Sequence, residues 1–491
     1  MRVSDDSKTP PDEGAPAPRT TRRGFLRTTA VATAAFAVGC GGEIALGDAS
    51  TQEDGGAGDA GADDTDDGGR DAGIDAGPPQ PVVPPEETPE VGAFGIGIAS
   101  GDVSTSAATV WTRYDGSAPL AVAVWEMDGE SYALLVTQSD CTPAEGGFVH
   151  VEIGGLTAGR RYRYAFFELA GNARTGRSPI GRFRASIAPD ALEPLIVGAV
   201  SCTSNGRGKE TLERAGERDD LDVFLLLGDT TYNDGASTID EFRASWAESL
   251  GSPGWMAVRR ATSVLATWDD HEVDNDFDPE DRDLTTPRQA YFENLPVRRD
   301  PVSPNRLWRA VRWGLTAEIF VLDGRGERRP STRGAEDIYL SREQMDWLKA
   351  GLTSSPCMFK LIANSVPIGD FPFPLAQDRW EGYGAQRTEI LSHIDDEAID
   401  GVVWISGDFH FASFGFVSPS GPGSTQREIL AGPGAQTGNP GAFILNRTQF
   451  PWSSTTNNYT SLELLPAQRR IRVWWHEGDG SVLEVREIDY P

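Results

Sequence analysis

The chain of 491 residues is poor in cysteine and in positive charge. Its four cysteines, Cys40, Cys141, Cys202 and Cys357, are too few for a disulfide-rich scaffold. Lys and Arg number 44 against 74 Asp and Glu, so the formal net charge is −30. Because an acidic surface repels phosphate backbones, we expect no nucleic-acid partner. The length allows two or three domains with a large core.

A second long apolar run is also lacking, so the N-terminus is the one place where a membrane signal is expected. Residues 1–42 are predicted to be an export signal. Thr21–Arg27 reads T-R-R-G-F-L-R, the twin-arginine pattern, and the apolar run Thr28–Val38 is too short to span a bilayer. The small residues before Cys40 resemble a bacterial lipoprotein signal, which implies lipidation of Cys40. The alternative is an ordinary export signal with a chance cysteine.

These features predict an exported protein, in the periplasm or at the cell surface, with a lipid anchor at Cys40 and the twin-arginine export machinery as a partner. Residues 43–91 are predicted to be an acidic linker. Between Gly41 and Glu90 there are fourteen acidic residues and one basic residue, Arg70. Such a composition cannot bury enough apolar surface to fold, and it suits a tether.

Residues 92–187 are predicted to form a β-sandwich, because short strands such as Ala108–Thr112 and Leu120–Glu126 alternate with Gly, Pro and Asp turns. The run G-L-T-A-G-R-R-Y-R-Y at Gly155–Tyr164 resembles the last turns of a fibronectin type III-like domain. No catalytic set of residue types occurs here, and His150 is interpreted as structural. We expect this domain to pack on the catalytic domain or to shape its entrance. Cys141 can pair with Cys357 if the fold brings the two together.

Residues 194–491 are predicted to form an α/β domain, because apolar strands alternate with helical patterns. Ser341–Leu352 has the pattern of an amphipathic helix, with Ser341 as the N-cap and with Met345 and Leu348 on one face. The strand pair Ser461–Leu465 and Ile471–His476 indicates antiparallel sheet edges or two sheets packed face to face.

Four of the expected strands end in side chains that can bind metal ions. Thr267–Asp276 reads T-W-D-D-H-E-V-D-N-D and holds five carboxylates, one His and one Asn. Water or cations must lie among so many carboxylates. Ser201–Thr203, Gly228–Tyr232 and Gly407–His410 follow three further strands. Because sites in open α/β sheets form outside the carboxyl ends of the strands, we expect these segments to meet.

The potential ligands fall into two chemical classes. Cys202 and Tyr232 favour a transition metal such as Fe(III), whereas Asp270, Asn275 and Asp408 are hard donors that suit Ca(II) or Mg(II). The sequence therefore predicts a cluster of two different cations, which would activate water and clamp the oxygens of an in-line displacement at phosphorus.

Three more residues have expected roles in this cluster. Asp229, on a tight Gly-Asp turn, is suited to bridge the two cations, and His410 can bind either ion class. His271, next to Asp270, is expected to stabilise charge or to protonate the leaving oxygen. Each motif alone also has an ordinary interpretation, as a buried cysteine or a solvated acidic loop. Four such motifs, each after a strand, make chance a poor explanation.

The motifs resemble those of the PhoD-like alkaline phosphatases, within the calcineurin-like metallophosphoesterase superfamily. They are S-C-T at Ser201–Thr203, G-D-T-T-Y at Gly228–Tyr232, W-D-D-H-E-V-D-N at Trp268–Asn275 and S-G-D-F-H at Ser406–His410. The resemblance covers Gly92 to about Trp475. It implies a β-sandwich followed by a four-layer αββα metallophosphatase domain.

The resemblance also implies an iron and calcium site that hydrolyses phosphate mono- and diesters, although other divalent metals remain alternatives. Cys202, Asp229 and Tyr232 would bind Fe(III), and Asp229 would bridge to Ca(II). The remaining Ca(II) ligands implied are Asp270, Asn275 and Asp408. His410 is implied as a ligand without a choice of ion, and the catalytic residues would be His271 and Asp229.

This sequence departs from the family pattern around the site. Thr230 and Thr231 stand where the family usually has an aromatic and an aliphatic residue, Asn233 replaces an acid, and Asp276 adds one. The ligands are intact, but the substrate pocket is expected to differ. Phosphate also needs cationic side chains. The candidate substrate-binding residues, chosen by position, are Asn364, Arg207, Arg325 and Arg379.

We therefore predict an exported, metal-dependent phosphatase or phosphodiesterase that acts on small phosphate esters. One alternative is a related hydrolase of phospholipid head groups or cell-wall phosphodiesters. A further alternative is a non-catalytic surface lipoprotein whose metal is structural.

Overall fold

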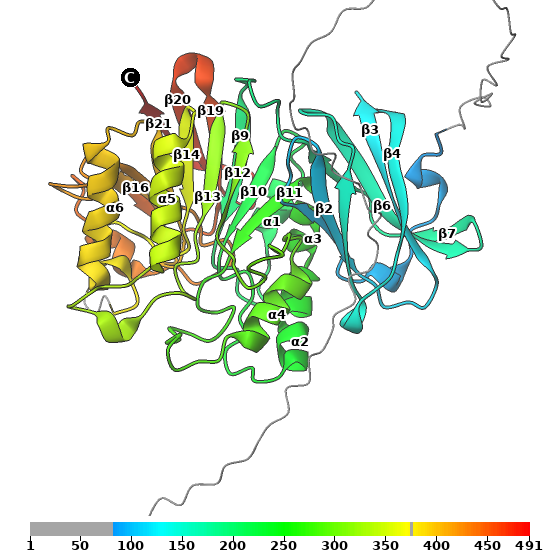
Figure 1. Ribbon diagram of the computed structural model, residues 1–491, viewed down its shortest axis with the longest axis horizontal. Helices are drawn as coiled ribbons and strands as arrows, with labels where there is room; N and C mark the ends of the chain where they lie inside the picture. Colours follow the sequence, from blue (N-terminus) through cyan, green and yellow to red (C-terminus); the bar gives the residue numbers. More distant parts are fainter. Residues whose placement is uncertain (1–81, 374–376) are drawn as a thin grey trace, which may run out of the picture. The chain divides into compact units, whose positions relative to one another are not determined.

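The computed structural model describes residues 82–373 and 377–491 (Figure 1). The predicted export signal, the lipidation site Cys40 and most of the predicted linker lie outside the described residues. Among the helices that are described, none combines the length and the hydrophobicity that a membrane span requires.

The N-terminal part of the described chain, up to about residue 187, is a β-sandwich, as the sequence predicts. One sheet contains β1 (Ile98–Gly101), β2 (Ala107–Arg113) and β5 (Phe148–Gly154). The other contains β4 (Ser131–Cys141), β3 (Leu120–Asp128), β6 (Arg161–Ala170) and β7 (Ala173–Arg177), and β8 (Gly181–Arg184) also pairs with β6. Alternate residues of both sheets, such as Val122 and Val124 of β3 and Val110 of β2, fill a shared core.

The end of the predicted linker is part of this folded unit. The backbone N–H groups of Val91 and Arg177 donate to Arg177 O and Pro89 O, both at 2.9 Å, and Pro85 and Thr88 are buried. Composition alone could not predict these contacts, because backbone groups make them and the side chains of this segment are mostly acidic. Residues 85–91, which the sequence analysis assigned to the linker, therefore belong to the folded sandwich.

The rest of the described chain forms the predicted four layers, which are helices, a first sheet, a second sheet and further helices. Its first sheet contains β21 (Val482–Asp489), β20 (Arg470–His476), β19 (Tyr459–Leu465), β9 (Leu195–Val200), β10 (Val223–Leu227) and β11 (Ser263–Thr267). Its second sheet contains β12 (Arg309–Trp313), β13 (Ala317–Val321), β14 (Phe359–Ala363), β15 (Val402–Ser406), β17 (Arg427–Leu430), β16 (Ala412–Phe416) and β18 (Trp452–Ser454).

Both faces of each sheet are covered, which explains the continuous apolar strands. Leu225 and Leu227 of β10 point into the core between the two sheets, whereas Phe224 and Leu226 pack under the helices of the first sheet. Those helices are α1 (Glu210–Gly216), α2 (Ile239–Leu250), α3 (Pro253–Ala261) and α4 (Thr285–Asn294). The helices α5 (Arg342–Ser354) and α6 (Gly384–Asp396) cover the second sheet, and the Ser341 side chain caps α5 (Figure 1).

The sandwich and the four-layer domain share one sheet. Strand β1 pairs in parallel with β11, so the sheet of nine strands runs from β21 of the four-layer domain to β5 of the sandwich. Polar contacts reinforce this joint. Asp102 accepts from Arg309 Nε at 2.7 Å and from the backbone N–H of Arg298 at 2.6 Å. Trp111 Nε1 donates to Glu293 O at 2.8 Å, and His150 Nε2 lies 3.0 Å from Leu295 O.

His150 therefore has a structural contact across the joint, in agreement with its interpretation. The possible pairing of Cys141 with Cys357 is not formed, because Cys357 is a buried free thiol whose Sγ lies 3.4 Å from Gly314 O.

The joint yields a test of stability. We expect Asp102→Ala to lower the free energy of unfolding by about 3 kcal/mol, because it leaves the largely buried Arg309 without its carboxylate. The matched control is Asp115→Ala, whose side chain is 58% exposed and lies 3.6 Å from Arg113. Its expected cost is below about 1 kcal/mol. Urea denaturation of both variants measures the difference, and equal costs would contradict the role of this joint.

Candidate metal centre

The four predicted strand ends meet in one place. Cys202 follows β9, Asp229 follows β10, Asp270 follows β11, and Asp408 and His410 follow β15. Three overlapping groups of potential ligand atoms lie within 4.8 Å of one another. These groups are Cys202 with Asp229 and His410, Asp229 with Asp270 and His271, and Asp269 with Asp270 and Asp408. Asp229 belongs to the first two groups, which is the position expected of a bridging residue.

The backbone is unusual at these positions. Cys202, Asp229, Asp408 and His410 have φ angles of 57°, 53°, 66° and 53°, in the left-handed region that favours glycine. Each such residue costs on the order of 1 kcal/mol. Four of them at one site indicate that the fold holds strain there in order to aim these side chains inward.

One end of the centre carries the softer donors. The Cys202 side chain is fully buried, Tyr232 OH donates to Asp229 Oδ2 at 3.1 Å, and His410 Nε2 lies 4.0 Å from the same oxygen. Burial, followed by the neighbouring Asp229 carboxylate, raises the pKa of the Cys202 thiol well above its usual range. Burial and the nearby Asp270 carboxylate likewise raise the pKa of Asp229.

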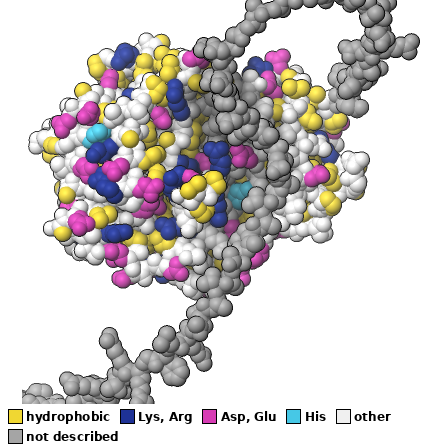
Figure 2. Space-filling view, viewed as in Figure 1, with side chains coloured by type: hydrophobic (Ala, Val, Ile, Leu, Met, Phe, Trp, Pro, Cys, Tyr) yellow, Lys and Arg dark blue, Asp and Glu magenta, His cyan; other side chains and the backbone are white. Residues whose placement is uncertain are grey.

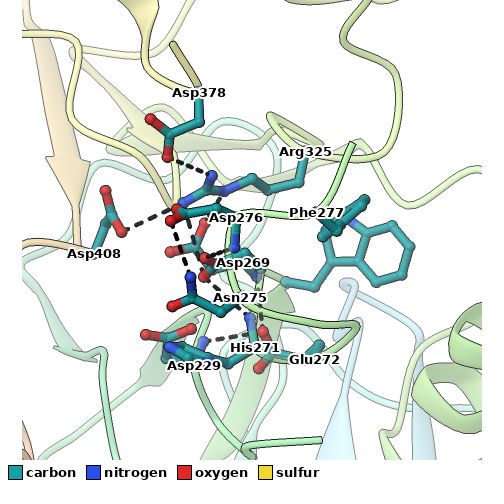
Figure 3. Close-up of polar contacts among 12 residues, drawn as sticks. Asp229, Asp269, His271, Glu272, Asn275, Asp276, Phe277, Arg325, Asp378 and Asp408 are labelled. Carbon is teal, nitrogen blue, oxygen red and sulfur yellow. Dashed lines mark hydrogen bonds and ion pairs between the residues drawn. The ribbon is translucent and has the colours of Figure 1, made fainter. Parts of the chain in front are cut away.

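The other end is acidic and is organised around one arginine (Figure 3). The fully buried Arg325 side chain reaches Asp269 Oδ1 at 2.5 Å, Asp378 Oδ2 at 3.0 Å and Asp408 Oδ1 at 3.3 Å. Its Nη2 also lies 3.8 Å from Asp270 Oδ1. Arg325 therefore holds the carboxylates in place. This differs from its predicted role as a substrate-binding residue, because its guanidinium is buried and shared among four acids.

Glu272 fixes the loops that carry the centre. Its carboxylate accepts the backbone N–H groups of Asp229 at 3.0 Å, Thr230 at 2.6 Å and Asp269 at 2.8 Å. One side chain thereby clamps the ends of β10 and β11 together. The sequence analysis did not assign this role. The sequence feature that could have indicated this role is the position of Glu272 directly after Asp269-Asp270-His271. An acidic side chain next to a turn can accept the backbone N–H groups of that turn.

His271 has a partner that the sequence analysis also missed. Its Nδ1 lies 2.8 Å from both carboxylate oxygens of Asp234, and its ring stacks on Tyr232 with the centroids 4.0 Å apart. Asp234 also accepts the backbone N–H of Asn275 at 2.8 Å. A carboxylate at Nδ1 fixes the ring and leaves Nε2 for chemistry.

The remaining predicted residues differ in their surroundings, and none of them belongs to the three groups of potential ligands. Asn275 is exposed, and its Nδ2 donates to Asp276 Oδ2 at 2.9 Å. Asn364 is buried, and its Oδ1 has no hydrogen-bond partner among the described residues. Arg207 donates to Thr437 Oγ1 at 2.6 Å. Arg379 pairs with Glu381 at 2.9 Å, and its guanidinium lies 5.3 Å from the ring centroid of Phe409.

The donors present fit metal cations. Asp229, Asp269, Asp270 and Glu272 are buried and Asp408 is partly buried. The buried guanidinium of Arg325 faces Asp269, Asp270 and Asp408. Within the described residues, Asp229 Oδ1 and Asp269 Oδ2 are buried oxygens without any hydrogen-bond donor. Such groups are costly unless a partner satisfies them, and a cation bound between them is a suitable partner.

Comparison with known proteins supports this interpretation of the site. A family model described as PhoD-like phosphatase matches residues 196–442, and the model of the PhoD-like phosphatase N-terminal domain matches residues 81–187. The chain belongs to the PhoD-like phosphatase family. The matched ranges contain the sandwich and all four strand ends of the metal centre, as the resemblance of the motifs predicted.

Individual relatives share sequence and fold with this family member. Alkaline phosphatase D of Bacillus subtilis is 28% identical over 381 residues, which are 65% of this chain and 64% of that protein. A solved structure of PhoD has a TM-score of 0.69 at 21% identity and covers 81% of this chain and 92% of its own. Purple acid phosphatase PPD1 from yellow lupin seeds has a TM-score of 0.59 at 14% identity and covers 80% and 73%, respectively.

The metal content of variants tests the centre. We expect Asp229→Ala to have a much lower metal content than the wild type, because Asp229 belongs to two of the three groups of potential ligands. The control Asp395→Ala changes a carboxylate at the far end of α6, which bonds Gln426 Nε2 at 2.9 Å, and should retain wild-type metal content. Elemental analysis of the purified proteins decides, and full metal content in Asp229→Ala would contradict the bridging position.

A pH test addresses a buried acid near the centre. Glu428 of β17 accepts from Ser406 Oγ and from the backbone N–H groups of Ile368 and Gly369, each at 2.8 Å. Burial raises its pKa from 4.5 to about 7. The folded protein therefore holds a proton that the unfolded chain releases, and this group makes stability fall as the pH rises from about 4.5 to 7.

The expected loss is about 3 kcal/mol, at 1.36 kcal/mol for each pKa unit. Glu428→Gln cannot titrate, so its free energy of unfolding should change less over this range than that of the wild type. Urea denaturation at several pH values measures both curves. Parallel curves would show that Glu428 is already ionised at the lower pH.

Proposed function

We propose that the protein hydrolyses phosphate mono- and diesters at a centre of two cations bridged by Asp229. The observation that carries the proposal is the overlap of two ligand groups at Asp229, one with Cys202 and His410 and the other with Asp270 and His271. Membership of the PhoD-like phosphatase family and the alkaline phosphatase activity named for the Bacillus subtilis relative support it.

The donor chemistry supports Fe(III) and Ca(II) as the two cations. Cys202, Tyr232 and His410 would hold Fe(III) with Asp229, and the harder donors Asp270, Asn275 and Asp408 would hold Ca(II). Bound cations of this kind supply an activated water and neutralise the charge that develops on the phosphoryl oxygens.

Two side chains would support this chemistry, His271 by transferring a proton and Arg325 by positioning carboxylates. His271, held at Nδ1 by Asp234, presents Nε2 as the acid that protonates the leaving oxygen. Arg325 holds Asp269 and Asp408 in place, so that the ligand set is preformed before substrate arrives.

A diester with an apolar alcohol, such as a phospholipid, is a second candidate substrate. Phe443 and Ile444 are 70% and 64% exposed on the 3-10 helix η6 (Pro440–Ile444). The segment that carries them is tied to the site, because Asn439 N donates to His410 O at 2.9 Å. Exposed apolar side chains beside a polar site favour a substrate that has a hydrocarbon part, more than they favour a polar cell-wall diester.

We also propose export through the twin-arginine machinery and anchoring by a lipid on Cys40. The T-R-R-G-F-L-R pattern and the small residues before Cys40 support this proposal. Labelling with a radioactive fatty acid in the wild type and in Cys40→Ser tests it. Equal labelling of the two proteins would contradict lipidation at Cys40.

The activity itself is tested with p-nitrophenyl phosphate and bis-p-nitrophenyl phosphate, with metal analysis of the same sample. We expect metal-dependent release of p-nitrophenol that disappears in Asp229→Ala. A folded, metal-loaded protein that leaves both esters intact would contradict hydrolysis of small esters. Vesicles that contain phosphatidylcholine then test the lipid substrate.

The His271–Asp234 pair gives a sharper prediction. We expect His271→Ala to lower kcat by at least about 100-fold with unchanged metal content, because a general acid contributes that much. Asp234→Asn should lower kcat by about tenfold and change its pH profile, because Asp234 orients the His271 ring and does not itself transfer the proton. Loss of metal from His271→Ala would instead show that His271 is a ligand.

A further inference from the structure

A second cavity lies apart from the metal centre, between the sandwich and the second sheet. Its volume is about 800 Å³, and none of the metal-centre residues line it. The walls are the loop after β1 (residues 102–105), Glu152 of β5, the segment 298–301 that follows α4, and the region of β12. Strand β12 is an edge strand, paired only with β13.

The lining is rich in arginine although the chain as a whole is strongly acidic. Five arginines and three carboxylates line the cavity, in a protein whose formal net charge is −30. The arginines are Arg298, Arg299, Arg306, Arg309 and Arg312, and the acids are Asp102, Glu152 and Asp300. On the face drawn in Figure 2, basic side chains are scattered among acidic and hydrophobic ones.

Each of the three acids already has an arginine partner. Asp102 accepts from Arg309 Nε at 2.7 Å, and Glu152 lies 3.4 Å from Arg298. Asp300 pairs with Arg306 and also accepts the backbone N–H of Val302 at 2.7 Å. Each carboxylate of the cavity is therefore paired with an arginine of the cavity wall.

Two guanidinium groups remain without a carboxylate in the described residues. Arg299 makes one ring contact, with its guanidinium carbon 4.5 Å from the centroid of Phe292. Arg312 donates to two backbone carbonyls, Gly314 O at 2.7 Å and Pro189 O at 2.9 Å. Both side chains belong to exposed residues in the cavity wall, so an anion from solvent can reach them.

We propose that this cavity binds a multivalent phosphate-bearing anion, such as an oligophosphate. Guanidinium groups bind phosphate oxygens in pairs of parallel hydrogen bonds, and the volume lies within the range of ligand sites. Arg299 and Arg312 supply the net positive charge, and Arg298, which has only an exposed carboxylate partner, can turn to the ligand. Among the described residues, none of the groups that could hold a metal ion lines this cavity, and the proposal is for binding alone. This site goes beyond the proposed phosphatase activity.

Arginine footprinting on the full-length, metal-loaded protein tests the site without using activity as a readout. The probe is imidodiphosphate, whose bridging nitrogen resists hydrolysis. We expect saturating imidodiphosphate to slow the modification of Arg299 and Arg312 by phenylglyoxal at least about fivefold, as measured by mass spectrometry. Arg469, which is exposed and lies 3.4 Å from Asp400, is the control and should react at an unchanged rate.

Variants complete the test. The double variant Arg299→Ala/Arg312→Ala should lower the affinity of this site at least about tenfold, with protection of Arg298 as the readout, whereas Arg469→Ala should not change it. Protection should also weaken as the salt concentration rises. No protection of Arg299 and Arg312, or equal protection of Arg469, would overturn the proposal, and so would an unchanged affinity in the double variant.

Discussion

The structure depends on the burial of more negative charge at one point than its own cations neutralise. The buried Arg325 guanidinium contacts Asp269, Asp270, Asp378 and Asp408, while Asp229 and Glu272 are buried close by without an arginine partner among the described residues. Burial raises the pKa of Asp229 and of Asp408, which means that the fold stores electrostatic work at this point. Bound cations would offset this electrostatic cost. The strained backbone at Asp229 and Asp408 then has a reason, because it directs their carboxylate oxygens toward the cations.

The surrounding architecture keeps this charged point rigid. Strands β9, β10, β11 and β15 are buried on both faces, and Glu272 clamps the turns after two of them through three backbone N–H groups. The sandwich contributes as well, because β1 extends the same sheet beside β11. The sandwich, which the sequence predicts as a separate domain, thus extends and supports the sheet that carries the ligands.

Much of this follows from the sequence for a physical reason. A strand that is buried on both faces must be apolar throughout, so Val223–Leu227 and the polar residues that follow it can be recognised in the sequence. Parallel strands bring such ends together at one edge of the sheet. The helices α3 and α4 were not predicted. Pro253–Ala261 is short and begins with Pro and Gly, and Thr285–Asn294 begins with two Thr and a Pro. The helix propensity of these first turns is weak, so packing decides. The Asp234–His271 contact, the burial of Arg325 and the shared sheet depend on tertiary geometry that spacing does not encode.

Anomalous diffraction from crystals of the metal-loaded protein tests the central claim most directly. Data collected on both sides of the iron edge should show one iron among Cys202, Asp229, Tyr232 and His410, with a second cation beyond Asp229 toward Asp270. Asp229 should contact both ions. A single ion that does not touch Asp229, or an Arg325 side chain that occupies the second position while the protein is active, would contradict the account.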